Sequence, residues 1–373
     1  MNRKKIPAID LFSGAGGLSQ GLSMVGFKIS GAVEINKSAI KTYTKQPFSK
    51  KTAIMNSDIS TLSGESILKK SKIKRDEVYL LAGCPPCQNF SPQNRNKHLL
   101  PIEVRVKLLY EYLRIIKEIN PPFVLMENVP GLSRGDLKHK FDDFVSQLKE
   151  NYHVEYDILN AADYGVPQKR KRLVLHAIRN DINAILKSEN VIMGLPPKTH
   201  NSDGSNGLKK WITVMQAIGD LPLISAGENF KSNEIYNHRC ARLSDKNLER
   251  ITIIRQNGGS RSGLPSQLQL KCHNEYLGHK DVYGIMNPNE PAPTLTGGCL
   301  SYSKGRYGHP FQNRAISARE AARIQTFPDS FIFEGALNDI ALQVGNAVPI
   351  ELVKASGMII KDLAYKYLEI KQK

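Results

Sequence analysis

The chain has 373 residues, of which 40% are hydrophobic, so it is long enough for one large domain or two with a buried core. A formal net charge of +17 and a pI of about 9.5 indicate a polyanionic partner, most often nucleic acid, although a lysine-rich surface alone would give the same values. Five irregularly spaced cysteines argue against a disulfide framework, and no apolar run suits a signal peptide or a membrane span. We therefore expect a soluble, cytoplasmic or nucleoid-associated protein.

Strands and helices alternate in the first half of the chain. Short apolar runs predict strands over residues 6–12, 27–34, 78–82, 123–126 and 173–178. Patterns typical of helices cover residues 18–25, 68–75, 104–119 and 137–148. This alternation implies an α/β fold with a doubly wound, mostly parallel sheet, in which ligands bind at the carboxyl ends of strands. Asp10, Glu34, Cys87 and Glu127 fall at or just after such ends.

The residue composition of the sequence changes after about residue 180. Glycine, asparagine and serine cluster at residues 200–207 and 256–266, and short turn-bounded runs follow. The chain returns to a helical pattern over residues 350–367. We predict a catalytic, cofactor-binding domain made of residues 1–179 and 326–373, and a smaller loop-rich domain over residues 180–325.

A glycine-rich turn, Gly14-Ala15-Gly16-Gly17, follows the first strand and opens a helix. Glycines allow the backbone to approach a ligand closely, and the helix N-terminus is electropositive. A nicotinamide or flavin site is the natural rival, but the spacing is not that of the dinucleotide fingerprint. The turn alone indicates a ligand loop without identifying the ligand.

The run Cys84-Pro85-Pro86-Cys87 follows a buried strand and has the cysteine spacing of redox sites and of zinc half-sites. Zinc normally takes four ligands, and no second pair at ligand spacing exists in the sequence, so we expect no metal. A redox motif usually opens a helix directly, whereas Pro92 discourages one here. The remaining interpretation of this run is a cysteine thiolate that faces a ligand.

Two further groups carry polar side chains at the edges of strands. Glu127 ends a strand, where a carboxylate often only caps the next loop, and Asn128 is expected to hold that loop. Arg170 and Arg172 lie in a basic run that would ordinarily be a solvated face or a phosphate contact. Because side chains alternate along a strand, both arginines should point to the same side.

Taken in order, these motifs resemble those of the cytosine-C5 DNA methyltransferases, and the resemblance runs from near the N-terminus to near the C-terminus. It rests on DLFSGAGG at 10–17, GCPPCQNFS at 83–91, ENV at 127–129, QKRKR at 168–172 and QVGNAV at 343–348. It implies a Rossmann-like, S-adenosylmethionine-dependent catalytic domain and a target-recognition domain over residues 180–325. The cofactor residues that it implies are Phe12, Gly14, Ala15, Gly16, Gly17, Glu34, Asp58, Ile59, Pro86 and Asn346. Ile35 stands where an aromatic residue is frequent.

The resemblance also implies a mechanism. Cys87 would add to C6 of a flipped-out cytosine, so that C5 becomes nucleophilic, whereas Cys84 holds a position that the family does not require. Glu127 would act at N3, Arg172 at O2, and Arg170 would support the site. Double-stranded DNA would be held by phosphate and base-edge contacts from Ser91, Arg242, Arg255 and Arg261.

The implied function is sequence-specific methylation in a bacterial restriction–modification system, by a monomer that acts beside a cognate endonuclease. A tRNA cytosine-C5 methyltransferase and a catalytically silent DNA-binding protein are the rivals. The long segment between Arg172 and Arg314 favours DNA, because a recognition domain needs that bulk. The hypothesis of a catalytically silent DNA-binding protein is disfavoured because Cys87, Glu127 and Arg172 are all present. The charges of residues 314–331 are expected to be structural.

Overall fold

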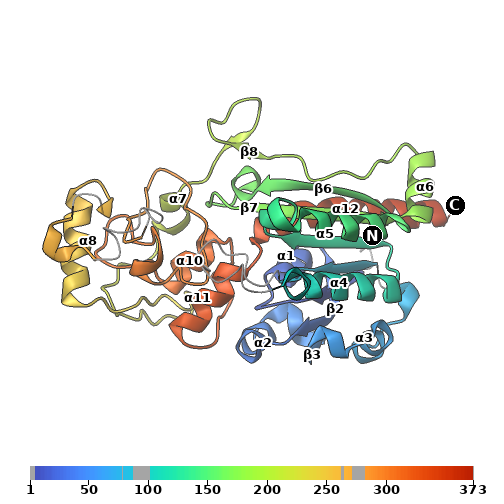
Figure 1. The fold of residues 1–373 in the computed structure, drawn as a ribbon, viewed down its shortest axis with the longest axis horizontal. Helices are drawn as coiled ribbons and strands as arrows, with labels where there is room; N and C mark the ends of the chain where they lie inside the picture. Colours follow the sequence, from blue (N-terminus) through green and yellow to red (C-terminus); the bar gives the residue numbers. More distant parts are fainter. Residues whose placement is uncertain (1–4, 78, 87–100, 262–263, 271–281, 373) are drawn as a thin grey trace. The chain divides into compact units, whose positions relative to one another are not determined.

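The structure, a computed structural model, describes residues 5–77, 79–86, 101–261, 264–270 and 282–372. The chain divides into two compact units (Figure 1). The first, here the sheet unit, comprises residues 1–160, 171–198 and 350–373. The second unit comprises residues 161–170 and 199–349.

The sheet unit is built on a seven-stranded sheet with the order β3-β2-β1-β4-β5-β7-β6. Its strands are β1 (Ile6–Leu11), β2 (Phe27–Glu34), β3 (Ala53–Asn56), β4 (Leu80–Gly83), β5 (Phe123–Asn128), β6 (Tyr152–Asn160) and β7 (Lys171–Arg179). The pairs from β3 to β5 are all parallel, and β7 runs antiparallel to both of its neighbours. The predicted doubly wound, mostly parallel sheet is confirmed.

Helices cover both faces of this sheet, which explains why β4 and β5 are buried along their whole length. The helices of the unit are α1 (Gly17–Met24), α2 (Lys37–Thr44), α3 (Gly64–Ser71), α4 (Ile102–Ile119), α5 (Lys138–Lys149), α6 (Asn180–Ser188) and α12 (Ile350–Lys371), and its 3-10 turns include η1 (Pro47–Lys51) and η2 (Ile59–Thr61). On one face, Leu11, Leu81 and Val124 of the strands share a hydrophobic core with α3, α4 and α5. None of the helices in the described ranges is long and apolar enough to cross a membrane.

Helix α12 comes from the far end of the chain and packs against α1. A Cβ atom on Gly21 would lie 2.6 Å from the side chain of Val353, so the two helices touch where α1 has no side chain. Gly357 repeats this arrangement, because a Cβ there would lie 2.9 Å from Val25. The C-terminal helix is thus part of the sheet unit.

The second unit has little regular structure. Its elements are β8 (His200–Asn201), β9 (Lys209–Lys210), α7 (Val214–Ile218), α8 (Asp245–Gln256), α10 (Ala318–Ile324) and α11 (Leu337–Asn346). A small core joins Ile251 and Ile254 of α8 to Tyr283, Ile285 and Tyr302. The loop-rich character predicted for this part of the chain agrees with these elements.

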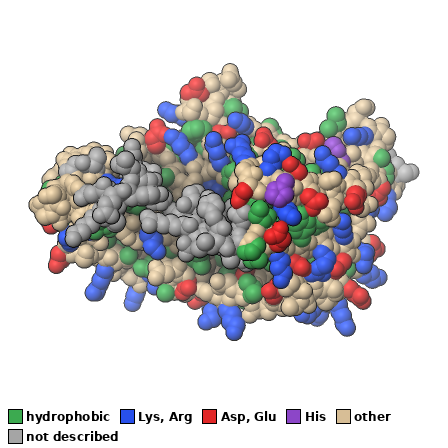
Figure 2. Space-filling view, in the orientation of Figure 1, with side chains coloured by type: hydrophobic (Ala, Val, Ile, Leu, Met, Phe, Trp, Pro, Cys, Tyr) green, Lys and Arg blue, Asp and Glu red, His purple; other side chains and the backbone are tan. Residues whose placement is uncertain are grey.

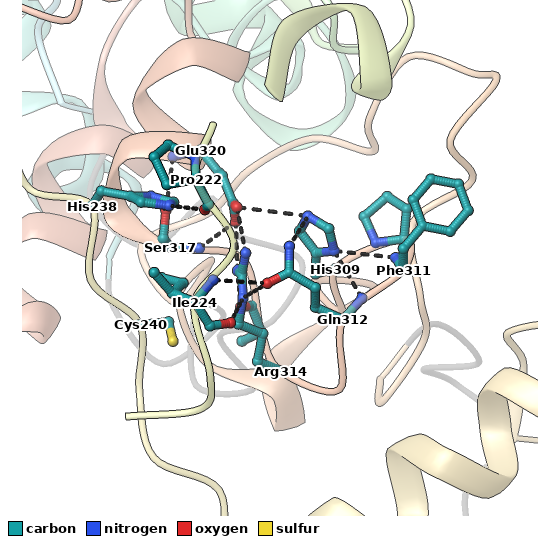
Figure 3. Close-up of polar contacts among 12 residues, drawn as sticks. Pro222, Ile224, His238, Cys240, His309, Phe311, Gln312, Arg314, Ser317 and Glu320 are labelled. Carbon is teal, nitrogen blue, oxygen red and sulfur yellow. Dashed lines mark hydrogen bonds and ion pairs between the residues drawn. The ribbon is translucent and has the colours of Figure 1, made fainter. Parts of the chain in front are cut away.

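A buried polar network holds the loops of the second unit together (Figure 3). Arg314 donates two hydrogen bonds to Glu320, at 2.6 and 2.7 Å, and both side chains are almost fully buried. Glu320 also accepts from the backbone N–H of Ser317, while Nδ1 of His309 accepts from the backbone of Gln312. Burial lowers the pKa of His309 to about 4, so the ring is neutral at pH 7. The expectation that the charges of residues 314–331 are structural agrees with these contacts.

The unit boundaries differ from the predicted domain boundaries for three segments. Residues 161–170 and 326–349 group with the second unit, and residues 180–198 group with the sheet unit. The physical reason lies in long-range bonds: the Gln325 side chain donates to the carbonyls of Val344 and Ala347, and the Gln168 side chain donates to Gln325. The division of function between residues 1–179 with 326–373 and residues 180–325 stays a prediction.

Candidate active site

The carboxyl ends of β1 and β4 meet where the strand order of the sheet reverses. The backbone N–H of Cys84 donates to the carbonyl of Leu11 at 3.3 Å, so the loops that leave these two strands start side by side. Ligands of open α/β sheets bind in the crevice outside such a reversal. One of these loops begins the glycine turn and the other begins the run Cys84-Pro85-Pro86.

The glycine turn has the left-handed backbone that its sequence suggests. φ is +59° at Phe12, +54° at Gly14 and +98° at Gly16. A Cβ on Gly16 would lie 2.9 Å from Phe48, so packing requires that glycine. A Cβ on Gly14 would meet no atom within 4 Å, so the backbone at Gly14 borders open space in which a ligand can approach it closely.

Glu34, at the end of β2, is tied to this turn. Its Oε2 accepts from the backbone N–H of Gly14 at 2.8 Å, and its Oε1 accepts from the backbone N–H of Asn36 at 2.7 Å. The carboxylate therefore fixes the turn and the start of α2 together. Its side chain remains half-buried, so part of it faces outward.

The remaining predicted cofactor residues of the sheet unit lie on or near these loops. Asp58 is exposed and caps η2 by accepting from the N–H and the hydroxyl of Ser60, which lower the pKa of its carboxyl. Ile59 is buried beside it, and Phe12 is half-buried with its ring edge-on to Tyr112 at 6.4 Å. Ala15 and Gly17 are buried in the turn, whereas Pro86 is exposed.

A buried polar chain beneath the turn was not predicted as part of the site. Asp10 of β1 is fully buried and accepts from the Ser19 hydroxyl at 2.6 Å, and Ser19 lies 2.7 Å from the hydroxyl of Tyr43. Burial raises the pKa of Asp10 to about 7, with a further rise from the charge of Glu34. The only sequence signal for this group is an aspartate near the end of an otherwise apolar strand.

Glu127 and Arg172 are brought together by the antiparallel pairing of β5 and β7. The Nε of Arg172 lies 2.9 Å from Oε1 of Glu127, and both side chains are nearly buried. Burial lowers the pKa of Arg172, and the charge of Glu127 opposes that change. This predicted pair of catalytic candidates therefore shares one position at the end of the sheet.

The segment that leads to Cys87 is attached to the same strand end. The side-chain amide of Asn128 donates to the carbonyl of Pro85 at 2.8 Å, as expected of a residue that holds the loop. Burial raises the pKa of the Cys84 thiol well above its usual range, and the negative charges of Glu127 and Asp10 raise it further. Cys84 is therefore a neutral thiol and a poor nucleophile. Cys87 and Ser91 lie outside the described residues.

Arg170 and Asn346 belong to the second unit. Arg170 is buried and donates to the carbonyls of Leu295, Gly345 and Ala347, so it joins two distant segments of that unit. Asn346 ends α11 and has an exposed side chain. The supporting role predicted for Arg170 and the cofactor contact predicted for Asn346 both stay predictions.

The three arginines predicted to bind DNA differ in their surroundings. Arg255 donates to the carbonyls of His309, Pro310 and Gln312, so its guanidinium holds that loop. Arg242 is exposed and its side chain lies across Gly227. Arg261 is half-buried. Of the three, Arg242 is the one whose exposure suits a DNA contact.

Comparisons with known proteins agree with this geometry. The sequence profile described as C-5 cytosine-specific DNA methylase matches residues 6–362. Type II methylase M.HgiDII of Herpetosiphon aurantiacus is 34% identical over 368 residues, which cover 97% of this chain and 95% of that protein. Type II methyltransferase M1.HphI of Haemophilus parahaemolyticus is 32% identical over 354 residues, 93% of this chain and 84% of that protein.

A solved structure from an E. coli prophage, proposed to be a DNA modification methyltransferase, superposes with a TM-score of 0.67 at 25% identity, and the match covers 97% of this chain and 100% of that one. The ordered motifs, the sheet topology and these similarities all lead to the same assignment. The chain therefore belongs to the C-5 cytosine-specific DNA methylases and is a DNA (cytosine-5-)-methyltransferase by enzyme class.

Proposed function

We propose that the chain methylates C5 of a flipped-out cytosine at a specific sequence in duplex DNA, through a covalent bond between Cys87 and C6. The observation that carries this proposal is the Glu127–Arg172 pair, 2.9 Å apart, at the strand end to which Asn128 fastens the Cys84-Pro85-Pro86 segment. An acid and a guanidinium held there suit the N3 and O2 edge of a cytosine ring, which needs charge stabilisation when sulfur adds to C6.

The residues around the glycine turn fit S-adenosylmethionine. The open space beside Gly14, the carboxylate of Glu34 at the next strand end and the ring of Phe12 offer backbone, hydroxyl-binding and stacking contacts, respectively. Asp58 and Ile59 would lie along the adenine edge, and Pro86 and Asn346 would complete the pocket. When bound, S-adenosylmethionine supplies the methyl group that C5 takes up.

The protein's own groups perform the remaining steps. The Cys87 thiolate forms the S–C6 bond, Glu127 holds a proton at N3, and Arg172 stabilises the negative charge at O2. Loss of the C5 proton then allows the S–C6 bond to break, which restores the aromatic ring and the thiolate. Arg170 supports the site by ordering the segments around Leu295 and Gly345.

The biological setting follows from the relatives' names and from charge. The two quoted relatives are named as a Type II methylase and a Type II methyltransferase, so we propose a restriction–modification role for this chain, with a cognate endonuclease of the same specificity. Residues 180–325 would read the sequence, with the exposed Arg242 and the half-buried Arg261 as contacts and with Arg255 ordering the loop at residues 309–312. Ser91, outside that range, would contact phosphate. The net charge of +17 suits a cytoplasmic monomer that binds DNA.

Bisulfite sequencing of DNA from cells that express the chain tests this proposal. We expect protected cytosines at one short recurring sequence, and none in cells that express the Cys87→Ala variant. Protection scattered without a recurring sequence would contradict sequence specificity. Methylation of tRNA by the purified chain, with no protection of DNA, would show that tRNA and not DNA is the substrate.

A further inference from the structure

We propose that a basic ridge on the sheet unit is a second DNA-binding surface, which holds phosphates of duplex DNA without reading their sequence. The ridge consists of five lysines, namely Lys37 and Lys41 in α2, Lys45 at the C-cap of α2, and Lys50 and Lys51 in η1. The inference rests on the proposed function in that DNA is the partner. It places DNA contacts on a part of the chain other than residues 180–325.

The ridge has an unusual charge balance. Residues 35–57 contain these five lysines and neither aspartate nor glutamate, and all five lysines are exposed. Other surface lysines have carboxylate partners, such as Asp142 for Lys138 and Glu351 for Lys354. Within the described ranges Lys37, Lys41, Lys50 and Lys51 form no ion pair. Within the described residues, the positive charge of these four lysines is therefore not neutralised by an ion pair.

The spacing on α2 places like charges together. Lys37, Lys41 and Lys45 follow one another at intervals of four residues, so they lie on one face of the helix. Like charges at this spacing destabilise a helix, and Lys37 also lies at the positive N-terminal end of the helix dipole. A bound polyanion would remove this repulsion.

The opposite side of the ridge is rigidly attached to the sheet unit. Tyr43 is buried, reaches Ser19 at 2.7 Å and lies edge-on to Phe48 at 5.2 Å. Ser49 donates to the carbonyl of Gln46, and the hydroxyl of Thr52 donates to the carbonyl of Ile29 in β2. The lysines are thus presented by a preformed surface, so binding would not require this segment to fold.

Figure 2 shows Lys and Arg side chains along the lower edge of the sheet unit, where α2 lies in Figure 1. Lysine ammonium groups act as point charges on phosphate and do not provide the forked donors that recognise a base edge. The surface therefore suits the regular phosphates of a duplex. Its expected role is to add sequence-independent affinity that keeps the enzyme on DNA.

The test compares two triple variants with equal loss of charge. Lys41→Gln/Lys50→Gln/Lys51→Gln removes three ridge charges, and Lys149→Gln/Lys187→Gln/Lys371→Gln removes three exposed lysines elsewhere on the sheet unit. The affinity of each for a long duplex of random sequence is measured as a function of salt. Each lost phosphate contact lowers the slope of log K against log salt by about 0.9, so the ridge variant should lose about 2 to 3 units.

The control variant should keep the wild-type slope, and replacement of the same three ridge lysines by arginine should restore it. Cofactor affinity and turnover on a saturating short substrate should stay unchanged in all variants. Equal slopes for the ridge and control variants would overturn the inference. A wild-type chain that binds no duplex DNA even at low salt would instead overturn the proposed function, so the two failures are distinguishable.

Discussion

Glu127 of β5 and Arg172 of β7 form an ion pair, with 2.9 Å between Oε1 and Nε and about a tenth of each side chain exposed. Removing one partner of a buried pair leaves the other as an uncompensated charge, which costs about 3 to 5 kcal/mol. The pair thus fixes the position of Glu127 as well as its charge. Substitutions at either residue must keep the shape of the site if they are to report on chemistry.

Glu127→Gln keeps the shape of the site, but its amide cannot hold the proton at N3 and no longer carries the charge that pairs with Arg172. We expect single-turnover methyl transfer to fall by about 10²-fold or more, with a modest effect on DNA binding. The control is Glu150→Gln, an exposed glutamate on the same unit. Near-normal turnover would leave Glu127 as a structural cap for the loop.

Asn128→Ala tests the attachment of the Cys84-Pro85-Pro86 loop, which leads to Cys87 in the sequence. The variant loses the 2.8 Å bond to the Pro85 carbonyl, so the loop should sample wrong positions and turnover should fall about tenfold or more. Cofactor affinity, measured by calorimetry, should not change. Asn151→Ala, at an exposed position, serves as the control. Unchanged turnover would show that this bond does not position the loop.

Glu34→Ala tests the cofactor turn. Loss of the acceptor for Gly14 and Asn36 should loosen the turn, and loss of the outward carboxylate should remove contacts to ribose. We expect S-adenosylmethionine to bind about tenfold more weakly or worse, because each lost hydrogen bond costs about 1 kcal/mol. Glu65→Ala is the exposed control. Wild-type affinity in Glu34→Ala, or tight binding of NAD or a flavin by the wild type, would contradict the assignment of this turn.

Asp10→Asn tests the buried chain beneath the turn by its pH dependence. The folded pKa of about 7 lies above the ordinary value of 3.8, so the stabilisation is complete below about pH 4 and is lost as pH rises to 7. Between pH 5 and pH 8 the wild type should lose about 2 to 3 kcal/mol of stability that the asparagine variant keeps. Urea midpoints at pH 5 and pH 8 measure this difference, with the exposed Asp76→Asn as control. Parallel pH profiles for wild type and Asp10→Asn would contradict the buried carboxylic acid.

The sequence predicts most of the parallel half of the sheet. The strand over residues 27–34 is observed with those bounds as β2, because a glycine precedes it and a charged residue ends it. Strand β6 was not predicted, since Glu155 and Asp157 interrupt its apolar pattern at the exposed edge of the sheet. Helix α2 was not predicted either, because it contains few apolar residues and its lysines interrupt the pattern of the short buried face around Tyr43.

Contacts between distant segments could not be predicted from local patterns. Arg170 and Gly345 are 175 residues apart and meet through a hydrogen bond. No local pattern in either segment predicts that bond. The same holds for the pairing that brings Glu127 to Arg172, which depends on the antiparallel placement of β7 between β5 and β6. Motif order supplied the candidates, and the sheet topology explains why two of them touch.

The most direct test of the central claim is covalent trapping on duplex DNA that carries 5-fluorocytosine at the recognised position, in the presence of S-adenosylmethionine. Fluorine cannot leave as a proton does, so the wild type should form a stable adduct, and peptide mapping should place it on Cys87. Cys84→Ala should still be trapped, because burial keeps that thiol neutral, and Cys87→Ala should not. An adduct on Cys84, or trapping that survives Cys87→Ala, would contradict the account.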